Sequence, residues 1–240
     1  EPAQDLLFQC DQPDLSGPDN LVLQAARLLK DATGYQGGAR IHLAKRIPAA
    51  AGLGGGSSDA AAALQGLNQL WKLDLTRERL LEMASRLGSD VPFFLYGGTA
   101  EVEGRGNKVT PLPAPDKIWL VLLRPPLTLP EKTRRLYGSL NPRHFTGGEH
   151  TQALAEALLK GRALTEEMLF NVFEGVAPAL FPSLEEYRSR LRGVGARKVH
   201  LAGSGPAIFA LFDKRDVAEE TLAGLSDLEV HLAHTIAAAK

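Results

Sequence analysis

The sequence predicts an α+β fold in two domains, because helix and strand patterns are mixed along the chain without the regular alternation of an α/β protein. A chain of 240 residues, 44% hydrophobic and 23% charged, can bury one large or two small cores. Three prolines, Pro111, Pro113 and Pro115, mark a linker in the middle of the chain. We therefore expect a first domain over residues 1–112 and a second over residues 113–240.

The first half contains helical patterns on both sides of one strand pattern. Apolar residues recur three and four apart in the helical segments, whereas apolar and polar residues alternate in the strand. Asn20 precedes the first helix as an N-cap. The expected elements are helices over 20–34, 59–71 and 76–88 and a strand over 39–47. The order at the centre is therefore strand, glycine-rich loop, helix.

The second half mixes shorter helices and strands. The expected strands are 118–123, 199–201, 207–212 and 230–236, and the expected helices are 153–159, 164–173, 183–191 and 217–225. Residues 202–206, Ala-Gly-Ser-Gly-Pro, predict a glycine turn between two of these strands.

Composition excludes several classes of partner. With 27 Lys and Arg against 28 Asp and Glu, the net charge of -1 gives no general attraction for nucleic acid or an anionic membrane. No apolar run is long enough to cross a bilayer, and the single cysteine, Cys10, cannot form an internal disulfide. The six histidines show no zinc-ligand spacing. We expect a protein of the cytoplasm that binds a small molecule, as a monomer or a weak homodimer.

The clearest functional signal is the glycine-rich loop between the strand and the helix. Glycines let consecutive backbone N–H groups approach a phosphate, and the start of a helix adds the positive end of its dipole. The alternative is a flexible turn with no ligand. The spacing fits neither a Walker loop nor a dinucleotide-binding Gly-x-Gly-x-x-Gly. The candidate phosphate-binding residues are Pro48, Ala49, Ala50, Ala51, Gly52, Leu53, Gly54, Gly55, Gly56, Ser57 and Ser58.

Three segments together resemble one enzyme family. Residues 48–61, which begin Pro-Ala-Ala-Ala-Gly-Leu-Gly-Gly-Gly-Ser-Ser-Asp, resemble the second motif of the GHMP kinases. Residues 201–207, Leu-Ala-Gly-Ser-Gly-Pro-Ala, resemble the third motif, and residues 19–29 are similar to the helix beside the adenine pocket. The resemblance implies ATP and Mg²⁺ as cofactors. It also implies a ribosomal-protein-S5-like N-terminal domain and a ferredoxin-like C-terminal domain.

The resemblance assigns roles to individual residues. Asp90, in Gly-Ser-Asp-Val-Pro-Phe, matches the catalytic aspartate, although a turn aspartate is the plainer interpretation; partial burial would raise its basicity. Lys45 matches a lysine on the adenine side, and it is otherwise a solvated charge at a strand end. Ser58 would reach Mg²⁺. Asn20 would contact the purine or only cap its helix.

Four further residues are expected to contact the acceptor substrate. Gly203, Ser204 and Gly205 form the third motif, or only a tight turn. Tyr137 stands where related kinases place an aromatic ring that stacks on cytosine, and a structural tyrosine is the alternative.

The triple glycine followed by Ser-Ser-Asp is most similar to the branch of the family that phosphorylates a hydroxyl of a cytidine-diphosphate-linked methylerythritol, in non-mevalonate isoprenoid synthesis. The alternatives are a homoserine or mevalonate type of GHMP kinase, or a protein that binds nucleotide without turnover. The family's first motif, Pro-x-Ala-Lys-x-Asn, and the Tyr-His pair after it are not found, and alignment puts them before Glu1. We therefore expect a truncated, weakly active chain, from the cytoplasm or, with a transit segment removed, from the plastid stroma.

Overall fold

The computed structural model describes residues 1–238. These residues form two compact units. The first unit comprises Glu1–Ala49 and Gly54–Pro111, and the second comprises Ala50–Leu53 and Leu112–Ala238. Four residues of the glycine-rich loop therefore pack with the second unit, while the rest of the loop packs with the first.

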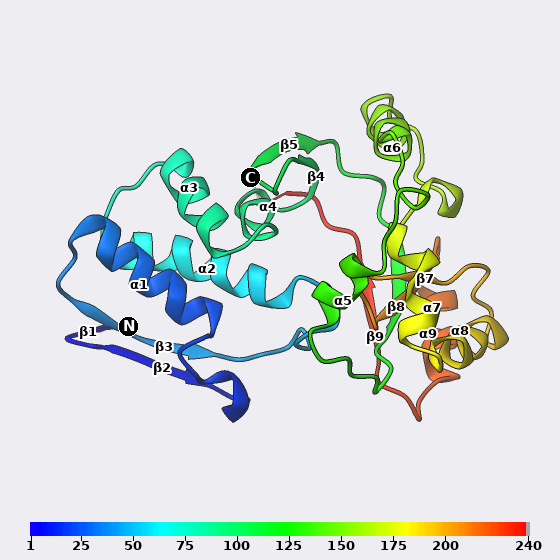
Figure 1. Cartoon of the computed structure of the whole chain (residues 1–240), viewed down its shortest axis with the longest axis horizontal. Helices are drawn as coiled ribbons and strands as arrows, with labels where there is room; N and C mark the ends of the chain where they lie inside the picture. The colour runs from blue at the N-terminus through cyan, green and yellow to red at the C-terminus, as the bar shows by residue number, and fades with distance from the viewer. Residues whose placement is uncertain (239–240) are drawn as a thin grey trace. The chain divides into compact units, whose positions relative to one another are not determined.

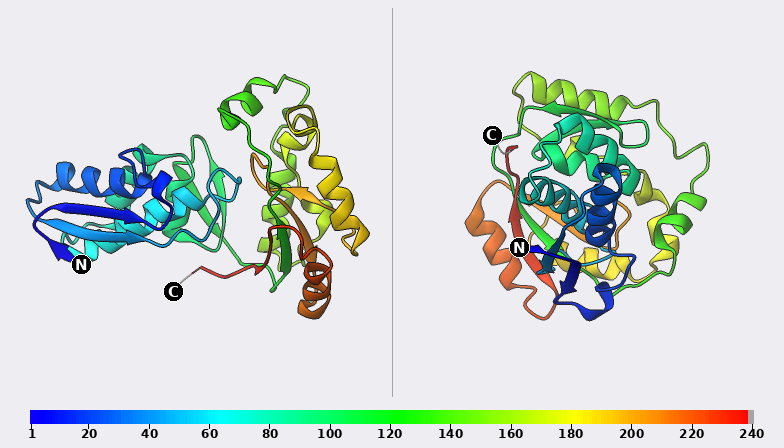
Figure 2. Two further views of the ribbon diagram at one scale, coloured as in Figure 1. Left: turned by 90° about the horizontal axis from the view of Figure 1, so that it is seen from below. Right: turned by 90° about the vertical axis from the view of Figure 1, so that its left-hand side faces the viewer.

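The first unit combines two sheets with helices. Its strands are β1 (Pro2–Ala3), β2 (Leu6–Cys10), β3 (Gly38–Leu43), β4 (Thr99–Glu103) and β5 (Lys108–Leu112), and its helices are α1 (Leu21–Thr33), α2 (Gly55–Leu70), α3 (Arg77–Leu87) and α4 (Val91–Tyr96), with a 3₁₀ turn at Pro13–Leu15. In the larger sheet β3 lies between β1, which is antiparallel to it, and β2, which is parallel. Helices α1 and α2 lie on one side of this sheet (Figure 1, and the right-hand view of Figure 2).

Small buried residues form the contact between α1 and α2. Ala25 and Ala26 of α1 and Ala60 and Ala61 of α2 are buried in one cluster, which also includes Leu64. Alanine at these positions lets the two helix backbones approach closely, and the surrounding leucines complete the core. This packing holds α2, the helix that follows the glycine-rich loop, against α1.

The second unit contains a four-stranded sheet covered by helices. Its strands are β6 (Trp119–Leu123), β7 (His200–Leu201), β8 (Ile208–Phe212) and β9 (Val230–His234), and its helices are α5 (Lys132–Gly138), α6 (Glu149–Leu159), α7 (Ala177–Leu180), α8 (Leu184–Gly193) and α9 (Arg215–Ala223), with 3₁₀ turns at Glu166–Met168 and Val172–Gly175. The strand order is β7-β8-β6-β9, and every paired strand is antiparallel. Counting strands in chain order, this is the 4-1-3-2 arrangement of a ferredoxin-like βαββαβ fold, as expected.

The alternation of residues along β6 and β8 explains the core of the second unit. Val121 and Leu123 of β6 and Ile208 and Ala210 of β8 are fully buried on one face. They pack in one cluster with Leu191 and other residues of the helices, because every second residue of a strand points to the same face. Within residues 1–238, no helix is both long enough and apolar enough to span a bilayer.

The prediction of a helix over residues 164–173 is wrong. Two short 3₁₀ turns occupy this region instead, and Leu169 between them is extended. The side chain of Asn171 accepts a hydrogen bond from the backbone N–H of Phe173 at 3.0 Å. This local bond competes with helix formation and is typical of asparagine in turns.

Other boundaries move by a few residues. The strand expected over 39–47 ends at Leu43, because its neighbour β2 ends at Cys10, the residue paired with Leu43. The helix expected from residue 59 begins at Gly55, and the helix expected from residue 153 begins at Glu149. The hairpin of β4 and β5 and helices α4 and α5 were not expected.

Candidate functional site

The second half of the glycine-rich loop forms the N-terminus of helix α2. Gly54 is the N-cap residue, with a φ of 67°, and Ser58 donates the first helical backbone bond, to the carbonyl of Gly54 at 2.9 Å. The backbone N–H groups of Gly54–Ser57 donate to no protein acceptor within residues 1–238. A helix N-terminus with free N–H groups and a positive dipole end is suited to an anion.

Two glycines in this half are required by packing. A Cβ added at Gly54 would lie 2.6 Å from the ring of Phe94. At Gly55 it would lie 2.8 Å from the Nζ atom of Lys45 and 2.8 Å from Ile47. Gly56 differs, because it is exposed and an added Cβ would meet only Leu21, at 3.6 Å.

Lys45 is buried next to Gly55, in the first turn of α2. Its Nζ donates to the Oδ2 of Asp59 on α2 at 2.6 Å, and the Lys45 side chain is only 3% exposed, against 20% for Asp59. The backbone N–H of Lys45 donates to Asp11 at 2.9 Å. That bond helps to lower the pKa of the Asp11 carboxyl. Lys45 is therefore an internal ion-pair partner, not a solvated charge, and its contact with adenine stays a prediction.

The first half of the loop packs against the third motif. Ala50 and Gly52 have positive φ values of 55° and 83°. The Ala51 carbonyl accepts a hydrogen bond from the N–H of Ala207 at 3.2 Å. A Cβ added at Gly52 would lie 2.1 Å from the carbonyl oxygen of Ala202, and one at Gly203 would lie 2.9 Å from the carbonyl oxygen of Gly52. The structure thus brings together two segments that the sequence pattern identified separately.

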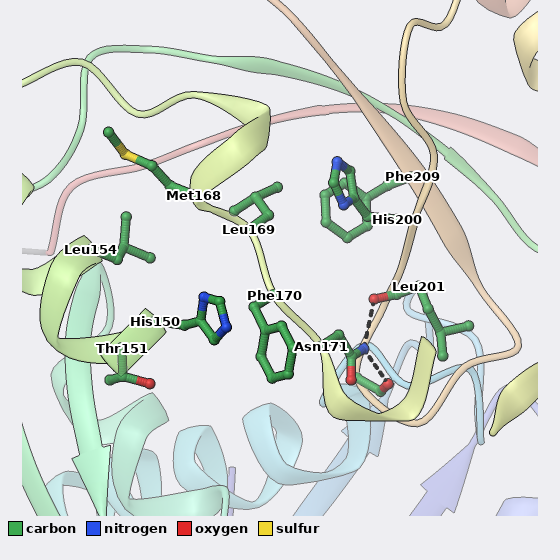
Figure 3. Close-up of a pocket in the computed structure, with 11 residues that line it drawn as sticks. His150, Thr151, Leu154, Met168, Leu169, Phe170, Asn171, His200, Leu201 and Phe209 are labelled. Atoms are coloured by element: carbon green, nitrogen blue, oxygen red, sulfur yellow. Dashed lines mark hydrogen bonds between the residues drawn. The ribbon is translucent and has the colours of Figure 1, made fainter. Parts of the chain in front are cut away.

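Two side chains that the sequence analysis missed hold this turn. The Nδ2 of Asn171 donates to the carbonyls of Leu201, at 3.0 Å, and Gly203, at 2.8 Å (Figure 3). The carboxylate of Glu174 accepts from the N–H of Leu201 and pairs with Arg188. Asn171 lies within the expected helix and Glu174 directly after it, so their role had no local signal.

Lys132, the first residue of α5, was also missed. Its Nζ donates to the carbonyl of Ala50 at 2.8 Å and to the carbonyl of Gly205. Burial lowers the pKa of Lys132 from 10.5 to about 8, because the charged form is partly removed from water.

Asp90 precedes helix α4 and is exposed. The expectation of partial burial is therefore wrong. Its carboxylate makes no hydrogen bond or ion pair within residues 1–238, so it can accept a proton or a hydrogen bond from a ligand. The backbone of the preceding residue, Ser89, lies against the turn between β4 and β5, where a Cβ at Gly106 would lie 1.7 Å from the Ser89 carbonyl oxygen.

The remaining candidates have clear positions. Asn20 caps α1: its Oδ1 accepts from the N–H of Val22 at 2.9 Å and its Nδ2 donates to Leu15 at 2.8 Å. Ser204 is half-buried in the third-motif turn. Tyr137 is 61% exposed and meets the ring of Phe173 edge-to-face at 5.1 Å. Whether Asn20, Ser204 and Tyr137 contact ligands stays a prediction.

A pocket of about 360 Å³ opens beside the third-motif turn in the second unit. Figure 3 shows His150 stacked on Phe170, with ring centroids 4.2 Å apart, on one side of it. His200 and Phe209 lie on the other side. The Nε2 of His200 is buried without a hydrogen-bond partner within residues 1–238, and burial lowers the pKa of this imidazole. Apolar and aromatic side chains make up most of the lining.

The residues near the loop fit a Mg²⁺ ion that is held mainly by phosphate oxygens. Within the described residues, no group of three or more His, Cys, Asp or Glu side chains is placed to bind a metal by itself. The hydroxyl of Ser58 donates to the Gly55 carbonyl at 2.8 Å, which leaves its oxygen lone pairs available. Magnesium is commonly held by few protein ligands and several phosphate or water oxygens. The Ser58 hydroxyl is therefore enough as the protein's own ligand to the ion.

Two family profiles match the chain. The profile described as GHMP kinases N terminal domain matches residues 20–98, and the profile described as GHMP kinases C terminal matches residues 153–228. Among relatives, a 4-diphosphocytidyl-2-C-methyl-D-erythritol kinase from Dehalococcoides mccartyi is 44% identical over 220 residues, covering 91% of this chain and 77% of its own. A kinase of the same name from Exiguobacterium sibiricum is 42% identical, covering 86% and 71%.

Solved structures agree on the fold. A crystal structure of 4-(cytidine 5'-diphospho)-2C-methyl-D-erythritol kinase matches 98% of this chain and 83% of its own, with a TM-score of 0.81 and 38% identity. A homoserine kinase from Cytophaga hutchinsonii has a TM-score of 0.75 with 19% identity, covering 99% of this chain and 83% of its own. The second match concerns the fold alone.

Proposed function

The chain belongs to the GHMP kinase family, and on that premise we propose that it transfers the γ-phosphoryl group of ATP to the 2-hydroxyl of 4-diphosphocytidyl-2-C-methyl-D-erythritol. This reaction belongs to non-mevalonate isoprenoid synthesis, and the bacterial source of the relatives supports a cytoplasmic location. Support for this acceptor, over homoserine or mevalonate, comes from relatives of that name at 42% and 44% identity.

The observation that carries the kinase proposal is the set of free backbone N–H groups at the start of α2. Gly54–Ser57 place successive donors at the positive end of a 16-residue helix, with no internal acceptor in the described chain. Such donors bind phosphate oxygens without needing a flexible side chain. In the proposed complex they hold the phosphates of ATP, and Mg²⁺, with the Ser58 hydroxyl among its ligands, supplies positive charge to the transferring group.

Asp90 is the proposed base. In the reaction the bond between the γ-phosphorus and the ADP oxygen breaks, a bond to the acceptor oxygen forms, and the hydroxyl proton leaves. An exposed carboxylate free of internal bonds is available to orient that hydroxyl and accept its proton. The contact of Gly106 with the Ser89 backbone supports a fixed position for this carboxylate.

The pocket beside the third motif is the proposed place for the pyrimidine base of the acceptor. Its volume of about 360 Å³ and its aromatic walls at Phe170 and His150 suit a flat ring. Tyr137, with its exposed ring, is the second candidate for stacking. The variants Phe170→Ala and Tyr137→Ala distinguish these two candidate stacking sites. The variant that lacks the ring on which the base stacks should have a higher KM for the acceptor and an unchanged KM for ATP.

The proposed reaction is tested by ADP release from the purified chain with ATP, Mg²⁺ and each of three acceptors. The expected result is turnover with 4-diphosphocytidyl-2-C-methyl-D-erythritol and none with homoserine or mevalonate. Turnover with another acceptor would reassign the substrate. ATP binding without turnover on any acceptor would contradict the proposal.

The role of Asp90 is tested separately. Asp90→Asn keeps the size of the side chain and removes the base, so kcat is expected to fall by roughly 100- to 10,000-fold. ATP affinity and the free energy of unfolding should stay near those of the parent, because Asp90 makes no internal bond in the described chain. Full turnover in this variant would remove Asp90 from the reaction.

A further inference from the structure

The most informative unassigned residue is Lys132, whose amine joins two backbone segments far apart in the chain. The Nζ donates to the carbonyl of Ala50, 82 positions away, and to the carbonyl of Gly205, 73 positions away. It forms no ion pair within the described residues, and it is half-buried. A lysine whose hydrogen bonds all go to backbone carbonyls holds those carbonyls in place. Its positive charge is not neutralised by a carboxylate.

The bond to Ala50 fixes the direction of a loop peptide. In a trans peptide the C=O of one residue and the N–H of the next point in opposite directions. Lys132 binds the Ala50 carbonyl, so the N–H of Ala51 points away from Lys132. The backbone N–H of Ala207 donates to the Ala51 carbonyl. By the same geometry, this bond sets the direction of the Gly52 N–H. Neither N–H has a protein acceptor within residues 1–238.

The backbone conformation of Ala50 costs free energy. Ala50 has a φ of 55°, a conformation that a residue with a Cβ rarely adopts without support. Burying the Ala51 side chain against Ala202 and Ala207 gives part of that support. The Lys132 bond gives further support, because it holds the carbonyl of Ala50, whose side chain is exposed.

We propose that Lys132 is a positioning residue for ATP binding: it ties the first half of the glycine-rich loop to the third-motif turn and so sets the direction of N–H groups that meet the phosphates. The inference rests on the proposed kinase function. Preorganised donors of this kind bind a charged group better because no reorganisation is needed when the ligand arrives.

The test compares Lys132→Met, which removes the amine, with Lys132→Arg, which keeps a charged donor. Lys160→Met, at the exposed C-cap residue that follows α6, is the control. We expect Lys132→Met to raise the KM and Kd for ATP about tenfold or more, and Lys132→Arg to recover much of that loss. Because Lys132 also binds the Gly205 carbonyl, in the turn expected to contact the acceptor, the KM for the acceptor is measured as well, and we expect the larger change in the KM for ATP.

Two outcomes would overturn the proposal. One is an unchanged Kd for ATP in Lys132→Met. The other is a parallel loss of kcat and unfolding free energy with both KM values unchanged, which indicates a purely structural role. Direct titration with ATP needs no acceptor, so it tests Lys132 even if the proposed acceptor proves wrong. An inactive parent chain that still binds ATP would count against the proposed function and not against Lys132.

Discussion

The two halves of the glycine-rich loop are built in different ways. Ala50–Leu53 packs with the second unit, where Gly52 lies against backbone atoms of Ala202 and Gly205. Gly54–Ser58 opens helix α2 in the first unit, where the neighbours are the side chains of Phe94 and Lys45.

This difference shows that glycines adjacent in sequence are required for different reasons. At Gly52 a side chain is excluded by the protein backbone, which cannot move cheaply. At Gly56 the protein leaves room for a side chain, so packing does not require glycine there, and the proposed approach of a phosphate would be a reason outside the protein. Substitutions along the loop can therefore distinguish glycines that packing requires from glycines that leave room for a ligand.

The largest combined effect, on stability and on ATP binding together, is expected at Gly52. Gly52→Ala would place a Cβ 2.1 Å from the Ala202 carbonyl oxygen, at a φ of 83° that alanine avoids. The loop has to move, and we expect a loss of roughly 2–4 kcal/mol in the free energy of unfolding together with weaker ATP binding. Urea unfolding and ATP titration measure the two effects. A variant as stable as the parent would mean that the loop does not rest on the third-motif turn.

The second half depends on the ion pair beneath it. Asp59→Ala leaves the charge of Lys45, which is 3% exposed, without its partner, whereas Lys45→Met leaves the charge of Asp59, which is 20% exposed. The more deeply buried unpaired charge costs more, so we expect losses of roughly 3–4 kcal/mol for Asp59→Ala and roughly 2–3 kcal/mol for Lys45→Met.

The double variant is the control for this pair. Combining Lys45→Met with Asp59→Ala removes both charges, so it should be more stable than the sum of the single losses predicts. Urea unfolding of the four proteins gives the coupling energy. A coupling near zero would show that the pair does not support the start of α2.

Lys132 makes the first half of the loop sensitive to pH. Its pKa is about 8 in the folded protein and 10.5 in the reference state, so between these values the unfolded chain binds more protons. The free energy of unfolding of the parent, measured against Lys132→Met, should therefore rise from about pH 8 to about pH 10.5 and stay level below pH 8. ATP affinity should fall as the pH rises through about 8, the pKa in the folded protein, because the protonated amine is the better donor. A stability difference that does not vary with pH would contradict the lowered pKa.

Local chemistry explains what could be predicted from the sequence. The N-cap at Asn20 and the glycine run before α2 need only neighbouring residues, and both features were found. The ferredoxin-like half was expected from a family resemblance, and its strand order confirms it. The helix predicted over 164–173 was wrong, and at the end of that segment the side-chain bond of Asn171 to the backbone of Phe173 competes with helix formation.

The missed residues have no local signal. Lys132 and Asn171 act on backbone carbonyls 82 and 32 positions away, and no spacing rule links residues so distant. Their side chains are ordinary in sequence and become significant only when tertiary structure supplies a carbonyl. Positioning residues of this kind are therefore harder to predict than the backbone motif that they hold.

The smallest change in stability is expected at Gly56, and it is the sharpest test of the comparison between the two halves. Gly56→Ala adds a Cβ that meets only Leu21, at 3.6 Å, and alanine favours a helix over glycine by up to about 1 kcal/mol. The variant should be as stable as the parent or slightly more stable. Because the added methyl group points into open space at the helix start, ATP affinity should nevertheless fall. If stability and ATP affinity both stay unchanged, phosphate does not approach Gly56, and the free N–H groups that bind it are those of the first half of the loop.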